Sequence, residues 1–227
     1  EWRSSQNPRE QSKRFHQGYR RGGKHMSQNY SKASYWDARY TKDKEAFEWY
    51  QSYRGLKHIV KPLVKSDAKV LIVGCGNSRL SSDIYDDAST DVTSIDISQV
   101  VIGDMKTKYR KKKGMQFIKM DAKNMDFKDG TFDVVVDKAL TDCLLCGDDG
   151  EEDLANSLAE ISRVLKPGGS YVCVSFGEPE CREEYFQSKG FNWECQKPIS
   201  IPKPTISSSN TDKVKEVHWC YVVKKNE

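Results

Sequence analysis

The sequence predicts an α/β fold in which a mostly parallel sheet carries helices on both faces. Short runs of apolar and β-branched residues recur along the chain, and stretches with apolar residues at helical spacing separate them. Such alternation of strand and helix produces β-α-β units, whose strands run parallel. The length of 227 residues fits one domain with a terminal extension.

The first predicted strand is Val70–Val73, a continuous apolar run that is typical of a strand buried on both faces. Residues 196–216, which contain Pro202 and Pro204, are expected to form a surface loop. Six further strands bring the predicted sheet to seven strands, at 92–95, 115–120, 132–136, 170–176, 191–195 and 217–223.

Helices are expected between these strands and ahead of the first. Ser98 suits the N-cap of the helix that follows the second strand, because a serine hydroxyl can accept from a free amide of the first turn. Residues 154–165 carry one apolar helix face, and the helix should end at Lys166–Gly169. Aromatic and apolar residues at helical spacing over 34–66 predict an N-terminal helical cap.

The basic character of the chain belongs to its N-terminal segment. The net charge is +4, but residues 1–25 hold seven basic and two acidic side chains, so the remainder carries −1. We expect residues 1–30 to be a disordered basic leader and residues 31–227 to form the domain. A nucleic-acid contact by this arm is the less favoured interpretation.

Composition excludes several classes of protein. No apolar run approaches the roughly 18 residues of a membrane helix, and no apolar segment typical of a secretory signal stands near residue 1. Seven scattered cysteines argue against a disulfide framework and for a reducing compartment, so we expect a cytoplasmic protein. Cys143 and Cys146 lack a second metal-ligand pair, and no metal site is expected.

Residues that can carry chemistry stand at the ends of the first four predicted strands. The first strand ends in the turn Gly74–Gly76, and the next three end at Asp96, Asp121 and Asp137. Ligands of open α/β sheets bind at the carboxyl ends of the strands, so these residues should share one crevice. Asp96, 22 residues after Gly74, suits the hydroxyls of a ribose, and Asp121 can accept from an adenine amino group. The predicted ligand is an adenosine derivative.

The acids also indicate which adenosine derivative is bound. Arg79 stands where a dinucleotide fingerprint has its third glycine, and a row of acids repels a pyrophosphate. S-adenosylmethionine carries a sulfonium and an amino group and no phosphate, and Asp137 would favour both positive groups. The aromatic residues Trp36, Tyr40 and Trp49 could add a lid with cation–π attraction.

Three segments resemble one subgroup of the class I (seven-stranded, Rossmann-like) S-adenosylmethionine-dependent methyltransferases. Val70–Ser78 is similar to the first motif of the elongation factor 1A and citrate synthase lysine methyltransferases and of the methyltransferase linked to endothelin-converting enzyme 2. Their Asp/Glu-Lys-Gly-Thr-Leu-Asp segment is approximately matched by residues 137–142, with Ala139-Leu140 in place of Gly-Thr. The resemblance covers residues 34–176. The subgroup's N-terminal Tyr-Trp…Arg-Tyr…Trp-Tyr/Phe pattern is matched by Tyr35-Trp36, Arg39-Tyr40 and Trp49-Tyr50.

The resemblance implies a cofactor site for S-adenosylmethionine, with S-adenosylhomocysteine as the product. It implies that Asp96 and Ile97 hold the ribose and adenine, that Asp121 and Ala122 flank the adenine, and that Lys138 lies beside the methionine. No catalytic residue is assigned. The cofactor-binding residues expected from residues and resemblance together are Trp36, Tyr40, Trp49, Gly74, Gly76, Asp96, Ile97, Asp121, Ala122, Asp137 and Lys138.

The sequence therefore predicts methyl transfer, with a protein lysine as acceptor by resemblance alone. A small-molecule methyltransferase, an NAD-binding dehydrogenase-like protein and a non-catalytic interaction module remain alternatives. A lysine acceptor must lose a proton, and Asp137 or Asp142 could relay it, although a cofactor contact for Asp137 and a helix cap for Asp142 are favoured. We expect a monomer that acts on a protein substrate, without a membrane partner.

Overall fold

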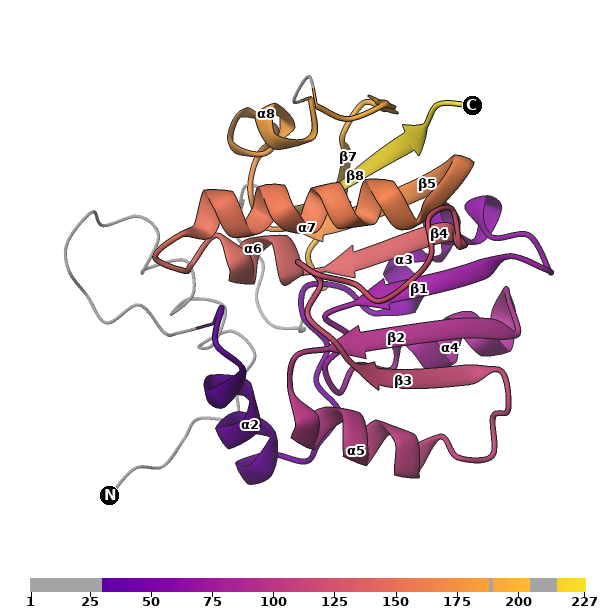
Figure 1. Ribbon diagram of the computed structural model, residues 1–227, viewed down its shortest axis with the longest axis vertical. Helices are drawn as coiled ribbons and strands as arrows, with labels where there is room; N and C mark the ends of the chain where they lie inside the picture. Colours follow the sequence, from indigo (N-terminus) through magenta and orange to yellow (C-terminus); the bar gives the residue numbers. More distant parts are fainter. Residues whose placement is uncertain (1–29, 188–189, 205–215) are drawn as a thin grey trace, which may run out of the picture.

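The structure is a computed structural model that describes residues 30–187, 190–204 and 216–227. The predicted leader lies outside these residues, except for Tyr30. A single sheet forms the centre of the molecule, and helices cover both of its faces (Figure 1).

The strands follow the order β3-β2-β1-β4-β5-β8-β6 across the sheet. The first five strands run parallel to one another, and β8 is antiparallel to β5. The predicted mostly parallel sheet is thus confirmed. The strands are β1 (Lys69–Val73), β2 (Asp91–Asp96), β3 (Met115–Lys119), β4 (Phe132–Lys138), β5 (Leu165–Ser175), β6 (Trp193–Cys195), β7 (Ile199–Pro202) and β8 (Val217–Lys225).

Strand β7 corrects the prediction of a loop over this stretch. It pairs with Val217–Cys220 of β8, while β6 pairs with Val223–Lys225 of the same strand, so the two share the seventh position of the sheet. Pro202 is tolerated in β7 because an edge strand has one side without ladder hydrogen bonds. Strand β5 also begins earlier than predicted, at Leu165, directly after the last helical residue.

The helices occupy the predicted intervals. The hydroxyl of Ser98 accepts from the amide of Val101 at 3.3 Å, which confirms Ser98 as the N-cap of α5. The predicted N-terminal cap consists of α2, α3 and the segment between them. The helices are α2 (Ala33–Lys42), α3 (Tyr53–Val60), α4 (Leu80–Asp87), α5 (Gln99–Lys108), α6 (Leu140–Leu144), α7 (Gly150–Val164) and α8 (Glu183–Phe186), with short 3₁₀ turns at η1 (Lys61–Leu63) and η2 (Pro179–Cys181).

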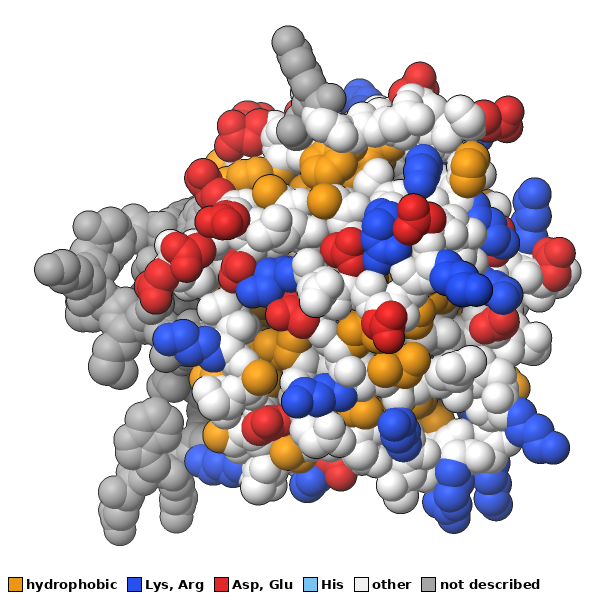
Figure 2. Space-filling view, viewed as in Figure 1, with side chains coloured by type: hydrophobic (Ala, Val, Ile, Leu, Met, Phe, Trp, Pro, Cys, Tyr) orange, Lys and Arg blue, Asp and Glu red, His pale blue; other side chains and the backbone are white. Residues whose placement is uncertain are grey.

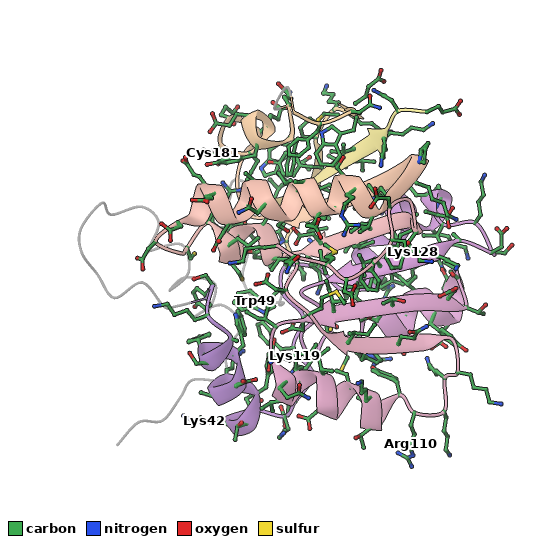
Figure 3. All side chains as sticks on the ribbon, in the orientation of Figure 1. Lys42, Trp49, Arg110, Lys119, Lys128 and Cys181 are labelled. Atoms are coloured by element: carbon green, nitrogen blue, oxygen red, sulfur yellow. The ribbon has the colours of Figure 1, made fainter. Side chains whose placement is uncertain are left out.

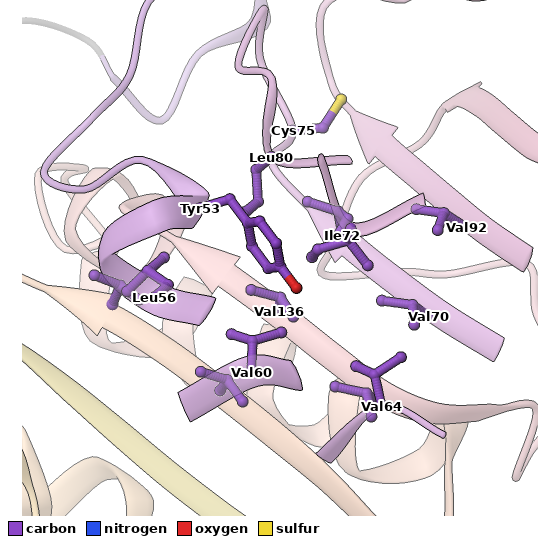
Figure 4. Close-up of a cluster of buried hydrophobic side chains, with 14 of the residues drawn as sticks. Tyr53, Leu56, Val60, Val64, Val70, Ile72, Cys75, Leu80, Val92 and Val136 are labelled. Atoms are coloured by element: carbon purple, nitrogen blue, oxygen red, sulfur yellow. The ribbon is translucent and has the colours of Figure 1, made fainter. Parts of the chain in front are cut away.

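Alternate residues of β1 belong to two separate cores. Val70 and Ile72 pack with residues of α3, α4 and α5, as Figure 4 shows in part, whereas Leu71 and Val73 pack with residues of α6 and α7. Each large apolar side chain buried in this way contributes about 1.5–3 kcal/mol. Because helices cover both faces, the carboxyl ends of the strands are left as the place where a ligand can enter.

The outer surface is mixed in charge. Figure 2 shows acidic and basic side chains interspersed over the face drawn there, with apolar side chains between them. This distribution agrees with the small net charge of the chain outside its first 25 residues.

Candidate cofactor site

A cavity opens at the carboxyl ends of β1, β2, β3 and β4. In Figure 1 these ends point towards α2 and α6, and Figure 3 shows Trp49 at the same edge of the sheet. Ten of the eleven predicted cofactor residues line the cavity. They are Trp36, Tyr40, Trp49, Gly74, Gly76, Asp96, Ile97, Asp121, Ala122 and Lys138.

The glycine turn after β1 has a backbone conformation that residues with a Cβ adopt only with strain. Gly74 and Gly76 have φ values of 62° and 51°, in the left-handed region that favours glycine. A Cβ on Gly76 would lie 2.7 Å from the hydroxyl oxygen of Tyr40. The turn therefore brings the backbone close to the aromatic cap and leaves its surface open to a ligand.

Asp96 ends β2 with a buried carboxylate that faces this turn. Its oxygens accept from the amides of Gly76 and Ser98, each at 2.9 Å. Burial raises the pKa of Asp96 to about 6, although these two amides oppose the shift. A carboxylate offers about four acceptor positions, so two remain for a ligand in the cavity. Paired acceptors of this kind suit the two hydroxyls of a ribose.

The wall next to Asp96 is formed by residues from the ends of β2 and β3. Ile97 and the buried Ala122 supply apolar surface, and the exposed Asp121 lies beside them. Asp121 accepts from the amide of Lys123 at 2.9 Å. An apolar slot with a carboxylate at its rim suits a planar base with an exocyclic amino group.

Aromatic residues of the cap form the opposite wall. The rings of Trp36 and Tyr40 are stacked at 5.7 Å, and Trp49 meets Trp36 edge-on at 6.4 Å. Tyr30 and Phe47 also line the cavity, and the carbonyl of Tyr30 accepts from the Trp36 indole at 2.6 Å. Such faces attract a positive centre by about 0.5–2 kcal/mol. Tyr30 and Phe47 were not predicted as site residues, because neither belongs to a sequence motif that marks a cofactor site.

Lys138 and Glu48 connect the cap to the end of β4 and to the residues that follow the glycine turn. The Lys138 ammonium lies 2.5 Å from a Glu48 oxygen and donates to the carbonyl of Trp49 at 3.1 Å. Glu48 also accepts from the Ser78 hydroxyl at 2.7 Å and the Arg79 amide at 2.6 Å. Burial lowers the pKa of Lys138. Glu48 was not predicted, because it lies in an irregular segment without periodic pattern.

Asp137 corrects one prediction, since it does not line the cavity. Its carboxylate accepts from the Leu140 amide at 2.7 Å, from the Thr141 amide at 3.0 Å and hydroxyl at 2.6 Å, and from the Tyr171 hydroxyl at 3.1 Å. Successive side chains of a strand point to opposite faces, so Lys138 faces the cap and Asp137 faces α6. Asp137 thus caps α6, and burial raises its pKa to about 6.

Asp142 is not the helix cap that the sequence suggested. It lies within α6, and both its side chain and that of Arg182 are buried, with 2.8 Å between Oδ1 and Nη2. Neither Asp137 nor Asp142 is among the residues that line the cavity.

Within 30–187, 190–204 and 216–227, no group of three or more His, Cys, Asp or Glu side chains could hold a metal ion. Among the helices of this same part of the chain, none has the length and apolar character to span a membrane.

Comparison with known proteins identifies the family. Residues 71–173 match the model of a methyltransferase domain. The chain is 30% identical over 174 residues to mouse EEF1A lysine methyltransferase 4, covering 72% of this chain and 68% of that protein. This chain belongs to the class I S-adenosylmethionine-dependent methyltransferases, in the group of the eEF1A lysine methyltransferases. Mouse eEF1A lysine and N-terminal methyltransferase is 41% identical over 158 residues, or 67% of this chain, but the match spans only 22% of that longer protein.

Solved structures agree on the fold of this methyltransferase. An S-adenosylmethionine-dependent methyltransferase from Methanosarcina mazei superposes with a TM-score of 0.56 at 19% identity, covering 74% of this chain and 97% of that one. The N-methyltransferase NodS from Bradyrhizobium japonicum, solved with S-adenosylhomocysteine, gives 0.57 at 14% identity, covering 77% and 83%.

Proposed function

We propose that this chain transfers a methyl group from S-adenosylmethionine to a lysine side chain of a protein, acting as a cytoplasmic monomer. The observation that carries the proposal is the placement of Asp96. Its carboxylate is held by two backbone amides at the end of β2, and it faces a cavity that is walled by aromatic rings on the other side. This combination suits an adenosine at one end and a positive sulfur centre at the other.

Each part of the cofactor would contact side chains whose charge and polarity suit it. Asp96 would accept from the ribose hydroxyls, and Asp121 from the adenine amino group, with Ile97 and Ala122 against the ring. The cofactor supplies an electrophilic methyl on sulfur. The turn at Gly74, Lys138 and the rings of Trp36, Tyr40 and Trp49 would hold its methionine half.

The acceptor amine needs alignment and loss of its proton. Closure of Trp36, Trp49 and Tyr30 around the cavity would exclude water and hold the amine in line with the methyl group. A lysine in such apolar surroundings has a lowered pKa, because burial disfavours the ammonium. The lysine would then release its proton to solvent water as it enters the cavity, and the neutral amine that remains can attack the methyl group. The names of the relatives make elongation factor 1A the acceptor to test first.

The test uses the purified chain, methyl-labelled S-adenosylmethionine and purified elongation factor 1A, with cell extract in parallel. We expect label on a lysine, found by peptide mass spectrometry, and its loss in Asp96→Ala. Label confined to small molecules would favour a small-molecule methyltransferase. Cofactor binding without any transfer would favour a non-catalytic module, and NADH binding a dehydrogenase-like protein.

A further inference from the structure

Tyr50 has a backbone conformation that needs support. Its φ is 59°, and Ala139 is the other non-glycine residue with positive φ in the described part of the chain. This region is unfavourable for residues with a Cβ, and bulky side chains enter it only where the surroundings hold them. Tyr50 lies in the segment between α2 and α3, directly after Trp49, whose ring lines the cavity.

A hydrogen bond to a buried carboxylate holds Tyr50 in place. Its hydroxyl donates to Oδ2 of Asp142 at 2.9 Å, and burial together with this carboxylate raises the pKa of Tyr50 well above its ordinary value. Asp142 is itself fixed, since Oδ1 accepts from the Ser175 hydroxyl at 2.6 Å and from Arg182 Nη2 at 2.8 Å. The amide of Phe176 donates to Oδ2 at 3.2 Å. The anchor of Tyr50 therefore has a single orientation.

The bond joins the cap to α6, and both contribute to the lining of the cavity. Trp49 belongs to the cap, whereas Asp142 lies in α6, whose residues Cys143 and Leu144 also line the cavity. The carbonyl of Trp49 is held separately by Lys138. If Tyr50 relaxed to a negative φ, the peptide between residues 49 and 50 would turn, and the Trp49 ring would move with it.

We propose that Tyr50 is a positioning residue whose hydrogen bond to Asp142 fixes Trp49 across the cofactor cavity and retains the bound cofactor. This inference rests on the proposed function for the identity of the ligand. A cap that Tyr50 no longer holds would be open for more of the time, and the ligand would leave faster in proportion to the open population. Tyr50 thus acts through Trp49 and touches no reacting atom.

Tyr50→Phe removes the hydroxyl and keeps the ring. It leaves no buried charge unpaired, because Asp142 retains Arg182, Ser175 and the Phe176 amide. Tyr53→Phe is a matched control. The Tyr53 hydroxyl also donates over 2.9 Å to an aspartate, Asp87, from the same N-terminal region, but neither Tyr53 nor its two neighbours in the chain line the cavity.

The experiment measures S-adenosylhomocysteine dissociation by stopped flow and the Trp49 signal by fluorine NMR of 5-fluorotryptophan protein, assigned with Trp49→Phe. We expect Tyr50→Phe to release the ligand about tenfold faster, as when the population of the open cap rises about tenfold, and to shift or broaden the Trp49 signal. Tyr53→Phe should change neither. Equal dissociation rates in the two variants, or an unchanged Trp49 signal, would overturn the role of Tyr50. Failure of the wild-type chain to bind would instead refute the proposed function, and this inference with it.

Discussion

Replacement of Asp96 by alanine removes the carboxylate on which the placement of the adenosine depends. In the wild type its oxygens accept from the Gly76 and Ser98 amides and leave two acceptor positions for ribose hydroxyls. Hydrogen bonds to a charged group contribute about 1.5–3 kcal/mol. Loss of the ribose contacts should therefore weaken S-adenosylhomocysteine binding by roughly 10- to 150-fold.

The titration of the Asp96 carboxylate also predicts that the affinity for the cofactor falls as the pH is lowered. The pKa of Asp96 is raised to about 6, so the group gains a proton as the pH falls through that value. A neutral carboxyl loses acceptor capacity, and the affinity should fall by about tenfold between pH 8 and pH 5. Asp96→Asn keeps the shape, cannot ionise, and should give weak binding with a flat profile over this range.

Isothermal titration calorimetry between pH 5 and pH 8 measures both effects, with circular dichroism to show that each variant is folded. Folding must be checked because Asp96→Ala leaves the amide of the buried Ser98 without its acceptor. Unchanged affinity in a folded Asp96→Ala protein would refute the placement of the ribose. A wild-type profile as flat as that of Asp96→Asn would refute the link to this carboxyl.

Three further predictions concern stability and are checked by urea denaturation. Glu48→Gln should lower the free energy of unfolding by about 1.5–3 kcal/mol, because the buried Lys138 ammonium loses its charged partner. Ala139→Gly should raise it by about 1 kcal/mol, since Ala139 has a φ of 80° that glycine adopts without strain; a decrease would contradict this explanation. Arg182→Met should lower it by about 3–5 kcal/mol, because Asp142 is then buried without a counter-charge, and a neutral effect would show that the ion pair adds little.

Local patterns were sufficient for the parallel strands of the sheet and for part of the cavity lining. The glycine turn follows β1, Asp96 ends β2, and Asp121 comes shortly after β3. Each has a physical reason to stand at a strand end, and the fold brings the strand ends together. Trp36, Tyr40 and Trp49 were proposed as a lid from cation–π chemistry, and the resemblance assigned them to the cofactor pocket, because helical spacing alone does not say what an aromatic face covers.

The sequence predictions failed for residues whose role depends on the direction of the side chain or on contacts with residues far away in the chain. Asp137 and Lys138 are neighbours, and only the two-residue period of β4 shows that they face opposite sides of the sheet. Asp142 was taken as a helix cap, but its partner Arg182 lies 40 residues away. Glu48 gains its role from contacts with two residues that follow the glycine turn and lie 30 and 31 residues further along the chain. Such contacts follow from tertiary packing and have no local signature.

The most direct test of the central claim is a calorimetric titration of the purified chain with S-adenosylmethionine and S-adenosylhomocysteine, with NADH in parallel. The claim is that the cavity between the glycine turn, Asp96 and the aromatic cap binds a sulfonium nucleotide. We predict micromolar binding of both sulfur nucleotides and none of NADH. Absence of binding by the sulfur nucleotides, or binding of NADH in their place, would contradict the claim and with it the role given to each residue of the site.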